Sequence, residues 1–253
     1  MRRIVCLAAV LAVAAAGAAR ADDQADLRKV IDKAVKAMGG QEKLAKFKAV
    51  TFKMKGKFYG MGDGIDYTGE WQLQYPDKIR MPIDGEIGGM QVHFFTRVIN
   101  GDKVWQKTAE EETKEVTDKE ELAQAREGLY GDWVQSLLPL KDKAFKLASL
   151  GDVKVNDKPA IGIRVSREGH RDVNLFFDKD KGLLVKREVT VKDEMTGGKE
   201  QTEETLFSDY KEYDGVLHAT KLLINRDGKK YVDGEASDFE AKDKLDDDLF
   251  AKP

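Results

Sequence analysis

The sequence predicts a mainly antiparallel β domain, in which a large curved sheet is covered by an N-terminal helical segment and one inserted helix. Along most of the chain, apolar residues alternate with polar ones, which is the pattern of strands with one buried face. The segments between these runs are short and rich in Gly, Asn and Asp, and such short connections join antiparallel strands. Helical spacing is predicted only over residues 26–48 and 118–138.

The N-terminal helical segment begins at about residue 26. Its apolar stripe repeats at i, i+3 and i+4 spacing and consists of Leu27, Val30, Ile31, Ala34, Val35 and Met38. Gly39 and Gly40 end this helix, as glycine commonly does at a helix C-terminus. Residues 41–48 are predicted to form a second short helix with Leu44 and Phe47 on one side.

A first run of strands follows, where the apolar period changes to two. The predicted strands cover residues 50–58, 65–75, 79–83 and 92–99, separated by a turn at 60–64 and by Pro76-Asp77. Asn100-Gly101 then precedes the apolar pair Val104-Trp105. Asn-Gly between two apolar runs predicts a hairpin with a type I′ turn, because both central residues of that turn need φ > 0.

The inserted helix is predicted over residues 118–138. Residues 110–115 before it are acidic and predict a loop or a sheet edge. Thr117 and Glu120 have the spacing of a capping box, which opens a helix, and Pro139 ends it. One face of the predicted helix carries Leu122, Leu129, Trp133 and Leu137.

A second run of strands occupies the rest of the chain, with turns marked by Asn-Asp, Asp-Gly and Gly-Gly pairs. The predicted strand centres are residues 145–147, 153–155, 161–165, 173–177, 183–191, 205–213, 217–224 and 231–239. No internal repeat and no Pro-, Ser- or Gly-rich linker divides the chain, so residues 22–253 are interpreted as one domain. A twisted sheet of this size tends to curl, and the helices are expected to cover its concave apolar face.

Residues 1–21 are interpreted as a secretory signal peptide. Arg2 and Arg3 form a positive n-region, residues 4–16 are an apolar run, and Ala19-Arg20-Ala21 fits the cleavage pattern. Cleavage after Ala21 places the protein in the periplasm or outside the cell. It changes the formal charge from −3 to −6, because three arginines leave, and it removes the single cysteine. The mature chain is then expected to have no disulfide, no thiol nucleophile and no transmembrane segment.

No motif predicts a catalytic, metal or cofactor site. His93, His170 and His218 lack a short metal-ligand spacing. Residues 178–182 resemble the start of a calcium loop, yet the glycine and the closing glutamate of the EF-hand template are missing. No serine lies in a G-x-S-x-G context, and no phosphate-binding glycine loop is present. Positive charges form no block, which argues against nucleic-acid binding.

Two stretches carry a resemblance to a known family. In residues 69–81, GEWQLQYPDKIRM, a Gly-led alternating strand runs into Pro76 and then into a second alternating strand. In residues 98–105, VINGDKVW, an apolar strand meets an Asn-Gly turn and a following aromatic residue. The chain is similar in both respects to the bacterial lipoprotein carriers of the LolA and LolB group and to the N-terminal domain of the periplasmic regulator RseB. The resemblance implies a half-open antiparallel barrel, lidded by helices, with an apolar cavity for acyl chains.

At one position the chain departs from that family. The lipoprotein carriers have an arginine directly before this proline, which helps to hold the lid closed, whereas this chain has Tyr75. The resemblance therefore implies an apolar cavity but not the latch of the carriers. The N-terminal cysteine of the membrane-bound receptor branch is also missing from the predicted mature chain.

Large apolar side chains on strand faces and on the inserted helix are the candidate lining of a ligand cavity. They are Phe52, Met54, Phe58, Tyr67, Trp71, Leu73, Tyr75, Met81, Phe94, Trp105, Trp133 and Phe177. The alternative is that these side chains fill an ordinary core. An open cavity would bind an acyl chain by burial alone, because each buried CH₂ contributes about 0.8 kcal/mol.

Three functional hypotheses follow. The first is an exported, non-enzymatic binding protein for a hydrophobic or acylated ligand, such as an acyl chain, a lipid or a lipoprotein. The second is a periplasmic regulatory or protein-interaction module of the same fold, with envelope proteins as partners. The third is a hydrolase that uses paired carboxylates, which a sequence cannot locate because such pairs form only in space.

Overall fold

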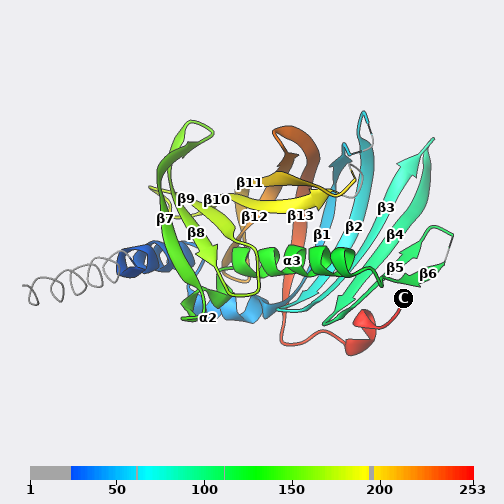
Figure 1. The fold of residues 1–253 in the computed structure, drawn as a ribbon, viewed down its shortest axis with the longest axis horizontal. Coiled ribbons are helices and arrows are strands. Elements are labelled where there is room, and N and C mark those ends of the chain that lie inside the picture. The colour runs from blue at the N-terminus through cyan, green and yellow to red at the C-terminus, as the bar shows by residue number, and fades with distance from the viewer. Residues whose placement is uncertain (1–23, 61, 111, 194–196) are drawn as a thin grey trace, which may run out of the picture.

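The computed structural model describes residues 24–60, 62–110, 112–193 and 197–253, and its main feature is one antiparallel sheet. Thirteen strands of the described residues form this sheet, which is curved and does not close (Figure 1). The prediction of a mainly antiparallel, curved sheet is confirmed. The proposed signal peptide, residues 1–21, lies outside the described residues, so it and the single-domain assignment stay predictions.

The sheet consists of two meanders that meet at one central pair of strands. The first meander comprises β1 (Ala49–Phe58), β2 (Ile65–Gln74), β3 (Lys78–Ile87), β4 (Met90–Asn100), β5 (Lys103–Thr108) and β6 (Thr113–Glu115). The second comprises β7 (Lys146–Val155), β8 (Lys158–Ser166), β9 (Val173–Asp178), β10 (Leu184–Asp193), β11 (Lys199–Tyr213), β12 (Val216–Arg226) and β13 (Lys229–Lys242). Within each meander, strands that follow one another in sequence lie side by side. The antiparallel pairing of β1 with β13 joins the two halves.

The pairing of β1 with β13 brings two glycines opposite each other, Gly56 and Gly234. A Cβ atom on Gly56 would lie 2.1 Å from the carbonyl oxygen of Asp233 and 2.8 Å from the Cα of Gly234. A side chain does not fit at this distance, so the close approach of the two strands requires glycine at position 56.

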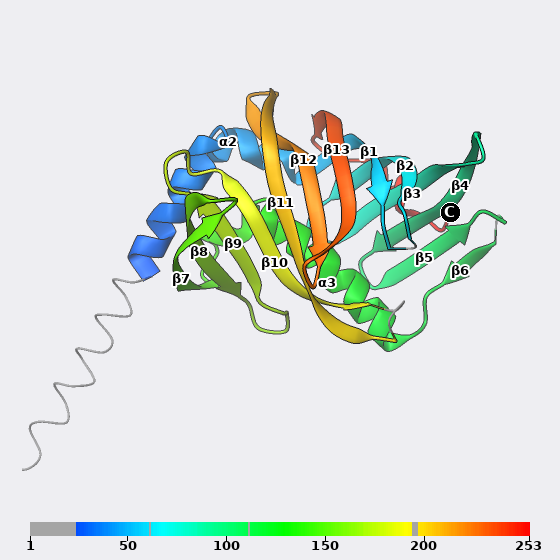
Figure 2. The same cartoon turned by 90° about the horizontal axis from the view of Figure 1, so that it is seen from above.

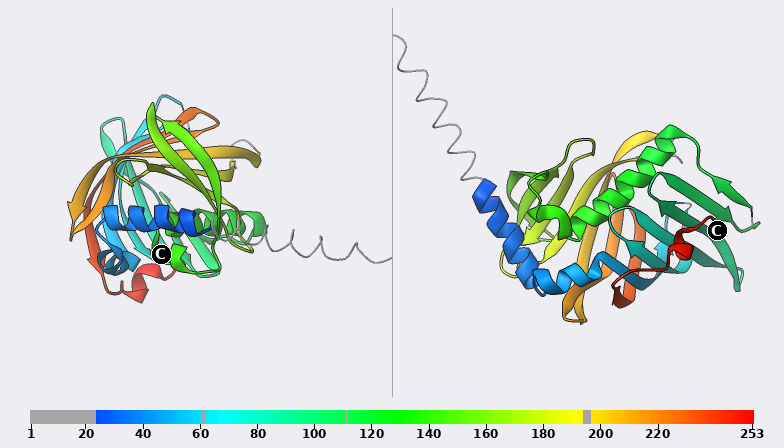
Figure 3. Two further views of the ribbon diagram at one scale, coloured as in Figure 1. Left: turned by 90° about the vertical axis from the view of Figure 1, so that its left-hand side faces the viewer. Right: turned by 90° about the horizontal axis from the view of Figure 1, so that it is seen from below.

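Helices lie on the concave side of the sheet. The first spans residues 24–37 and leads into α2 (Gln41–Leu44) and the 3₁₀ turn η1 (Ala45–Lys48). The inserted helix α3 (Lys119–Gln135) contacts β5 in the first meander and β9 and β10 in the second. It therefore runs across the opening between the two halves, and the strands curve over it when the molecule is seen from above or along its length (Figures 2 and 3). Among the described residues, no helix is both long and apolar enough to cross a membrane.

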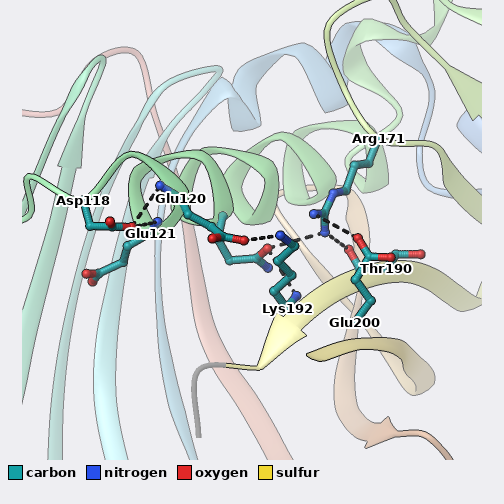
Figure 4. A network of polar contacts seen from close by, with 8 residues as sticks. Asp118, Glu120, Glu121, Arg171, Thr190, Lys192 and Glu200 are labelled. Carbon is teal, nitrogen blue, oxygen red and sulfur yellow. Dashed lines mark hydrogen bonds and ion pairs between the residues drawn. The ribbon is translucent and has the colours of Figure 1, made fainter. Parts of the chain in front are cut away.

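Polar contacts hold the N-terminal half of α3 to both meanders. Glu121 accepts a hydrogen bond from Arg97 of β4 at 2.9 Å, and Glu120 pairs with Lys192 of β10. Next to this pair, Arg171 donates a hydrogen bond to the carbonyl oxygen of Thr190 (Figure 4). These contacts connect α3 to β4 on one side and to β10 on the other.

One end of the interior is densely filled. Here the helix over residues 24–37, the end of α3 and strands β7 to β10 enclose side chains that are almost fully buried. The largest are Ile31, Val134, Leu137, Leu140, Phe145, Ile163, Val165, Leu175 and Phe177. This region supplies the hydrophobic core that stabilises the fold.

The C-terminal segment forms a second, smaller core on the outer face of the sheet. The 3₁₀ turn η4 (Asp247–Phe250) buries Phe250 against Val98 and Trp105. The side-chain amide of Asn100 donates to the carbonyl oxygen of Phe250 at 3.2 Å. Trp105 therefore faces away from the concave side.

Two predictions about the strands and their turns are corrected by the structure. The hairpin after β4 forms, but its central residues are Gly101 and Asp102, and only Gly101 has a positive φ, 58°. A type I′ turn at Asn100-Gly101 is therefore wrong, because Asn100 remains paired with Lys103 at the end of the strand. Likewise, residues 145–147 and 153–155 do not belong to separate strands. Residues 146–147 and 153–155 both belong to β7, which has an irregularity where Gly151 adopts a positive φ of 79°.

The start and end of α3 also differ from the prediction. Asp118, not Thr117, is the N-cap, and its carboxylate accepts hydrogen bonds from the backbone N–H groups of Glu120 and Glu121 at 2.9 Å each. The helix ends at Gln135, before Pro139, because Leu137 turns into the left-handed region with φ 63°.

The N-cap assignment is testable with two alanine variants. Asp118→Ala is expected to lower the free energy of unfolding by about 1 kcal/mol, because two backbone donors at the start of α3 lose their acceptor. Thr117→Ala, at the exposed neighbouring position, is the control and should change it by a few tenths at most. Urea unfolding at neutral pH measures both values. A larger loss for Thr117→Ala would contradict the assignment.

Candidate ligand-binding cavity

The other end of the interior is hollow. A cavity of about 1070 Å³ lies beneath β1 to β4 and β10 to β13, with α3 and the residues near η1 along its sides. Its volume is slightly above the range of roughly 300–1,000 Å³ that is typical of ligand pockets. Side chains alternate along each strand, so only one face of each strand points into the cavity. The interior of the curved sheet is thus packed with side chains at one end and contains a cavity at the other.

Aromatic side chains form much of the cavity wall. Phe52 of β1 lies between Trp71 of β2 and Phe239 of β13, at ring-centroid distances of 6.1 and 4.9 Å. Both neighbouring rings are nearly parallel to that of Phe52. Tyr67 meets the edge of Trp71 at 6.4 Å. The β1–β2 and β1–β13 pairings place these rings side by side on the concave face.

Two ion pairs interrupt the apolar wall where α3 approaches β10 to β12. Arg187 Nη1 lies 2.6 Å from a carboxylate oxygen of Asp132 on α3. Arg226 Nε lies 2.9 Å from Glu203 on the neighbouring strand. The side chains of Arg187 and Glu203 are 10% and 12% exposed. All four residues line the cavity, and their charges cancel.

His218 lines the cavity at the end nearest η1. Its ring lies 4.6 Å from that of Phe47 and 4.3 Å from that of Phe239. Burial lowers the pKa of this histidine to about 4, although the nearby charge of Asp214 opposes the shift. The imidazole is therefore neutral at physiological pH and behaves as part of the aromatic wall.

Nine of the twelve candidate residues from the sequence lie in the cavity wall. They are Phe52, Met54, Phe58, Tyr67, Trp71, Leu73, Tyr75, Met81 and Phe94. That these residues contact a ligand stays a prediction. The other three lie elsewhere. Trp105 packs under the C-terminal segment, Trp133 packs against Phe145 at a centroid distance of 5.7 Å, and Phe177 is fully buried at the filled end.

The second half of the lining was not among the sequence candidates. It comes mainly from β11 to β13 and includes Phe207, Tyr210, His218, Leu222, Ile224, Val232, Ala236 and Phe239. The alternation of these strands was recognised, but which face was inner could not be assigned. The charged part of the wall could have been predicted from the sequence. Arg187 precedes Val189 and Val191 at spacings of two and four, so the three side chains lie on the same face of one strand. A charged residue on an apolar face indicates a buried partner.

The histidines take part in local polar contacts. His93 Nδ1 lies 2.7 Å from Asp84, and its Nε2 lies 3.1 Å from the hydroxyl of Thr96, which is 4% exposed. His170 Nδ1 lies 2.9 Å from Glu127 on α3. No group of three or more His, Cys, Asp or Glu side chains within the described ranges is placed to hold a metal ion.

Residues 178–182 form a turn between β9 and β10. The carboxylate of Asp178 accepts hydrogen bonds from the backbone N–H groups of Asp180 and Lys181 at 2.9 and 2.7 Å. Gly182 has a positive φ of 74°, which such a turn favours. The resemblance to a calcium loop is thus accounted for by local turn geometry.

Solved structures share this fold at low sequence identity. A LolA superfamily protein from Nitrosomonas europaea aligns with a TM-score of 0.54 and 11% identity, over 84% of this chain and 97% of the other. A DUF1329 family protein from Desulfovibrio piger aligns with a TM-score of 0.58 and 12% identity, over 88% and 96%. A putative outer membrane lipoprotein-sorting protein domain from Vibrio parahaemolyticus aligns with a TM-score of 0.53 and 14% identity, over 88% and 97%. The chain therefore has a LolA-like fold.

Comparisons at the level of sequence find nothing similar. No protein-family model matches the chain, and no curated protein matches it. Identities of 11% to 14% support a common fold and leave the ligand open.

The filled and hollow ends should respond differently to truncation. Phe177→Ala is expected to lower the free energy of unfolding by about 3–5 kcal/mol, because it creates a void in a closely packed core. Phe52→Ala should lower it by only about 1–2 kcal/mol, since its half-buried ring already borders open space. Urea unfolding of the ligand-free protein measures both. Equal losses would mean that Phe52 is part of a filled core.

His218 should make stability depend on pH. Its pKa is about 6.5 in the unfolded chain and about 4 in the folded one, so the unfolded state binds more protons between these values. Its contribution is complete above pH 6.5 and is lost as the pH falls toward 4. Between pH 7 and pH 5 the loss should be about 2 kcal/mol.

His218→Phe supplies the control for this pH effect. Phenylalanine keeps an aromatic ring between Phe47 and Phe239 but cannot bind a proton. The variant should lose less stability than the wild-type protein between pH 7 and pH 5. If both proteins lose the same amount, the histidine is not buried in its neutral form.

Proposed function

We propose that this protein is an exported, non-enzymatic binding protein that holds a hydrophobic or acylated ligand in the cavity. The observation that carries this proposal is the open volume of about 1070 Å³ lined mainly by aromatic and aliphatic side chains. If those side chains filled an ordinary core, they would interdigitate and leave few voids larger than a water molecule.

The energetics of burial favour an acyl chain as the ligand. Each CH₂ group that moves from water to an apolar site contributes about 0.8 kcal/mol, so a long chain binds without specific polar contacts. The rings of Phe52, Trp71 and Phe239 provide a continuous apolar surface for such a chain. A long unbranched chain also adapts to an irregular cavity more readily than a rigid ligand.

The comparison of folds supports the same class of ligand. One of the structures that share the fold is a putative outer membrane lipoprotein-sorting protein domain. The proposed cargo is therefore an acyl chain carried by a lipid or a lipoprotein.

The proposed location is the bacterial periplasm or the exterior. It rests on the apolar run and cleavage pattern of residues 1–21. A protein that carries acyl chains in this compartment would receive them from, and deliver them to, envelope proteins or membranes. Those donors and acceptors are the partners that we propose.

The three tryptophans provide a test that locates the ligand. A nitroxide-labelled acyl methyl ester quenches indole fluorescence at short range, and Trp71 lies in the cavity wall whereas Trp105 lies on the opposite face of the sheet. The ester is expected to quench the fluorescence of the wild-type protein. Trp71→Phe should remove most of this quenching, because it removes the indole nearest the bound chain.

Trp105→Phe is the matched control for this titration. It removes an indole outside the cavity, so the fraction of fluorescence that the ester quenches should stay the same or rise. Both variants must retain the far-ultraviolet circular dichroism of the wild-type protein. Saturable binding with quenching that survives in Trp71→Phe would place the ligand elsewhere, and an absence of binding would contradict the proposed function.

A further inference from the structure

Two tyrosines of the cavity wall have hydroxyls with no hydrogen-bond partner among the described residues. Tyr67 in β2 and Tyr75, directly after β2, both line the cavity. Tyr67 is only 8% exposed. Tyr75 is surrounded by protein and partly buried, and it borders the cavity. Within the described part of the chain, neither hydroxyl makes a hydrogen bond, and neither is sealed off from open space. A third cavity tyrosine, Tyr210, differs because its hydroxyl donates to the carbonyl oxygen of Leu184.

Both of these hydroxyls keep their protons at physiological pH. Burial raises the pKa of Tyr67 to about 12, and the nearby charge of Asp233 adds to this shift. Burial and the charge of Asp132 also raise the pKa of Tyr75, against the opposing effect of Arg187. Each is therefore an uncharged O–H group that can donate a hydrogen bond to an acceptor inside the cavity.

The cavity wall has no unpaired positive charge among the described residues. Arg187 is paired with Asp132, and Arg226 is paired with Glu203. The remaining basic side chain in the lining, His218, is neutral. A ligand carboxylate would enter this wall without a counter-ion, and an unpaired charge in an apolar site is strongly unfavourable.

We propose that the cavity selects acyl chains whose polar end is an uncharged acceptor, an ester or amide carbonyl, over free fatty-acid carboxylates, and that Tyr67 or Tyr75 donates a hydrogen bond to that carbonyl. This inference rests on the proposed function, because it requires an acyl ligand in the cavity. A neutral tyrosine hydroxyl would donate to a neutral carbonyl oxygen, and the charges of the wall are already paired, so an uncharged ligand leaves no charge without a partner.

The two hydroxyls define two alternative docking points for the carbonyl. Tyr75 follows β2 and lies eight positions beyond Tyr67, a distance of about 26 Å if this segment is extended. One carbonyl therefore reaches only one of them. The Tyr67→Phe and Tyr75→Phe single variants identify which one, and the double variant removes both donors.

Three probes with the same chain length test the selectivity. Methyl laurate, laurate and dodecane are each titrated at pH 7 against the wild-type protein, with displacement of the nitroxide-labelled ester as the readout. Methyl laurate is expected to bind at least tenfold more tightly than laurate, and dodecane is the reference for burial of the chain alone. Equal or tighter binding of laurate would overturn the inference.

The tyrosine variants test the donors themselves. The double variant, Tyr67→Phe with Tyr75→Phe, should bind methyl laurate about fivefold more weakly and leave dodecane affinity unchanged. Its stability without ligand should equal or exceed that of the wild-type protein, because the hydroxyls it loses have no protein partner. Methyl laurate affinity that is unchanged in the double variant would overturn the role of the tyrosines.

Tyr210→Phe is the matched control. It removes a hydroxyl from the same cavity, but this hydroxyl already has an acceptor in the protein. Stability should therefore fall while the ratio of ester to dodecane affinity stays that of the wild-type protein. If the ratio of methyl laurate to dodecane affinity is the same in every variant, the inference fails while the acyl-binding function stands. If none of the probes binds, both fail.

Discussion

The pairing of β1 with β13 is the constraint on which the rest of the structure depends. It joins strands that are separated by most of the chain and turns two meanders into one sheet of thirteen strands. A strongly twisted open sheet rarely exceeds about ten strands without curling, so a sheet of this size bends around its apolar face. The approach of Gly56 to Gly234 lets the two strands meet closely at this seam. Without this pairing, each meander would present its own exposed apolar face.

The curved sheet has more concave surface than the helices cover. The helix over residues 24–37 and the end of α3 pack against β7 to β10, and this end is filled by Phe145, Phe177 and their neighbours. Around the β1–β13 seam, the inward rings of the strands line the cavity, with α3 and η1 at its sides. The division explains how the fold can be stable without ligand and still keep an open site. The packed end contributes the hydrophobic burial that stabilises the fold, and the cavity end contributes less of it.

Polar side chains in the cavity wall connect α3 to the sheet and keep the wall electrically neutral. Arg187 connects β10 to Asp132 on α3, so the helix is held to the sheet at the boundary between the filled and hollow ends. In the family that the sequence resembles, an arginine before the proline helps to hold the lid. Here Tyr75 occupies that position and contributes an uncharged hydroxyl to the cavity. The contact between helix and sheet comes from a different strand, and the charges in the wall remain balanced.

The sequence by itself determined the elements. The period-two runs located the strands, Gly39-Gly40 ended the first helix, and the curved antiparallel class followed from strand number and short turns. These are local properties, because hydrophobic period and turn chemistry act within a few residues. Errors arose where local options were nearly equivalent, as for Asp118 against Thr117 at the start of α3. The tertiary structure alone decided which face of β11 to β13 was inner, why Trp105 points outward, and that Arg187 meets Asp132. Each depends on segments far apart in the chain, and whether a concave face is filled or hollow depends on the total volume of side chains that the folded chain brings to it.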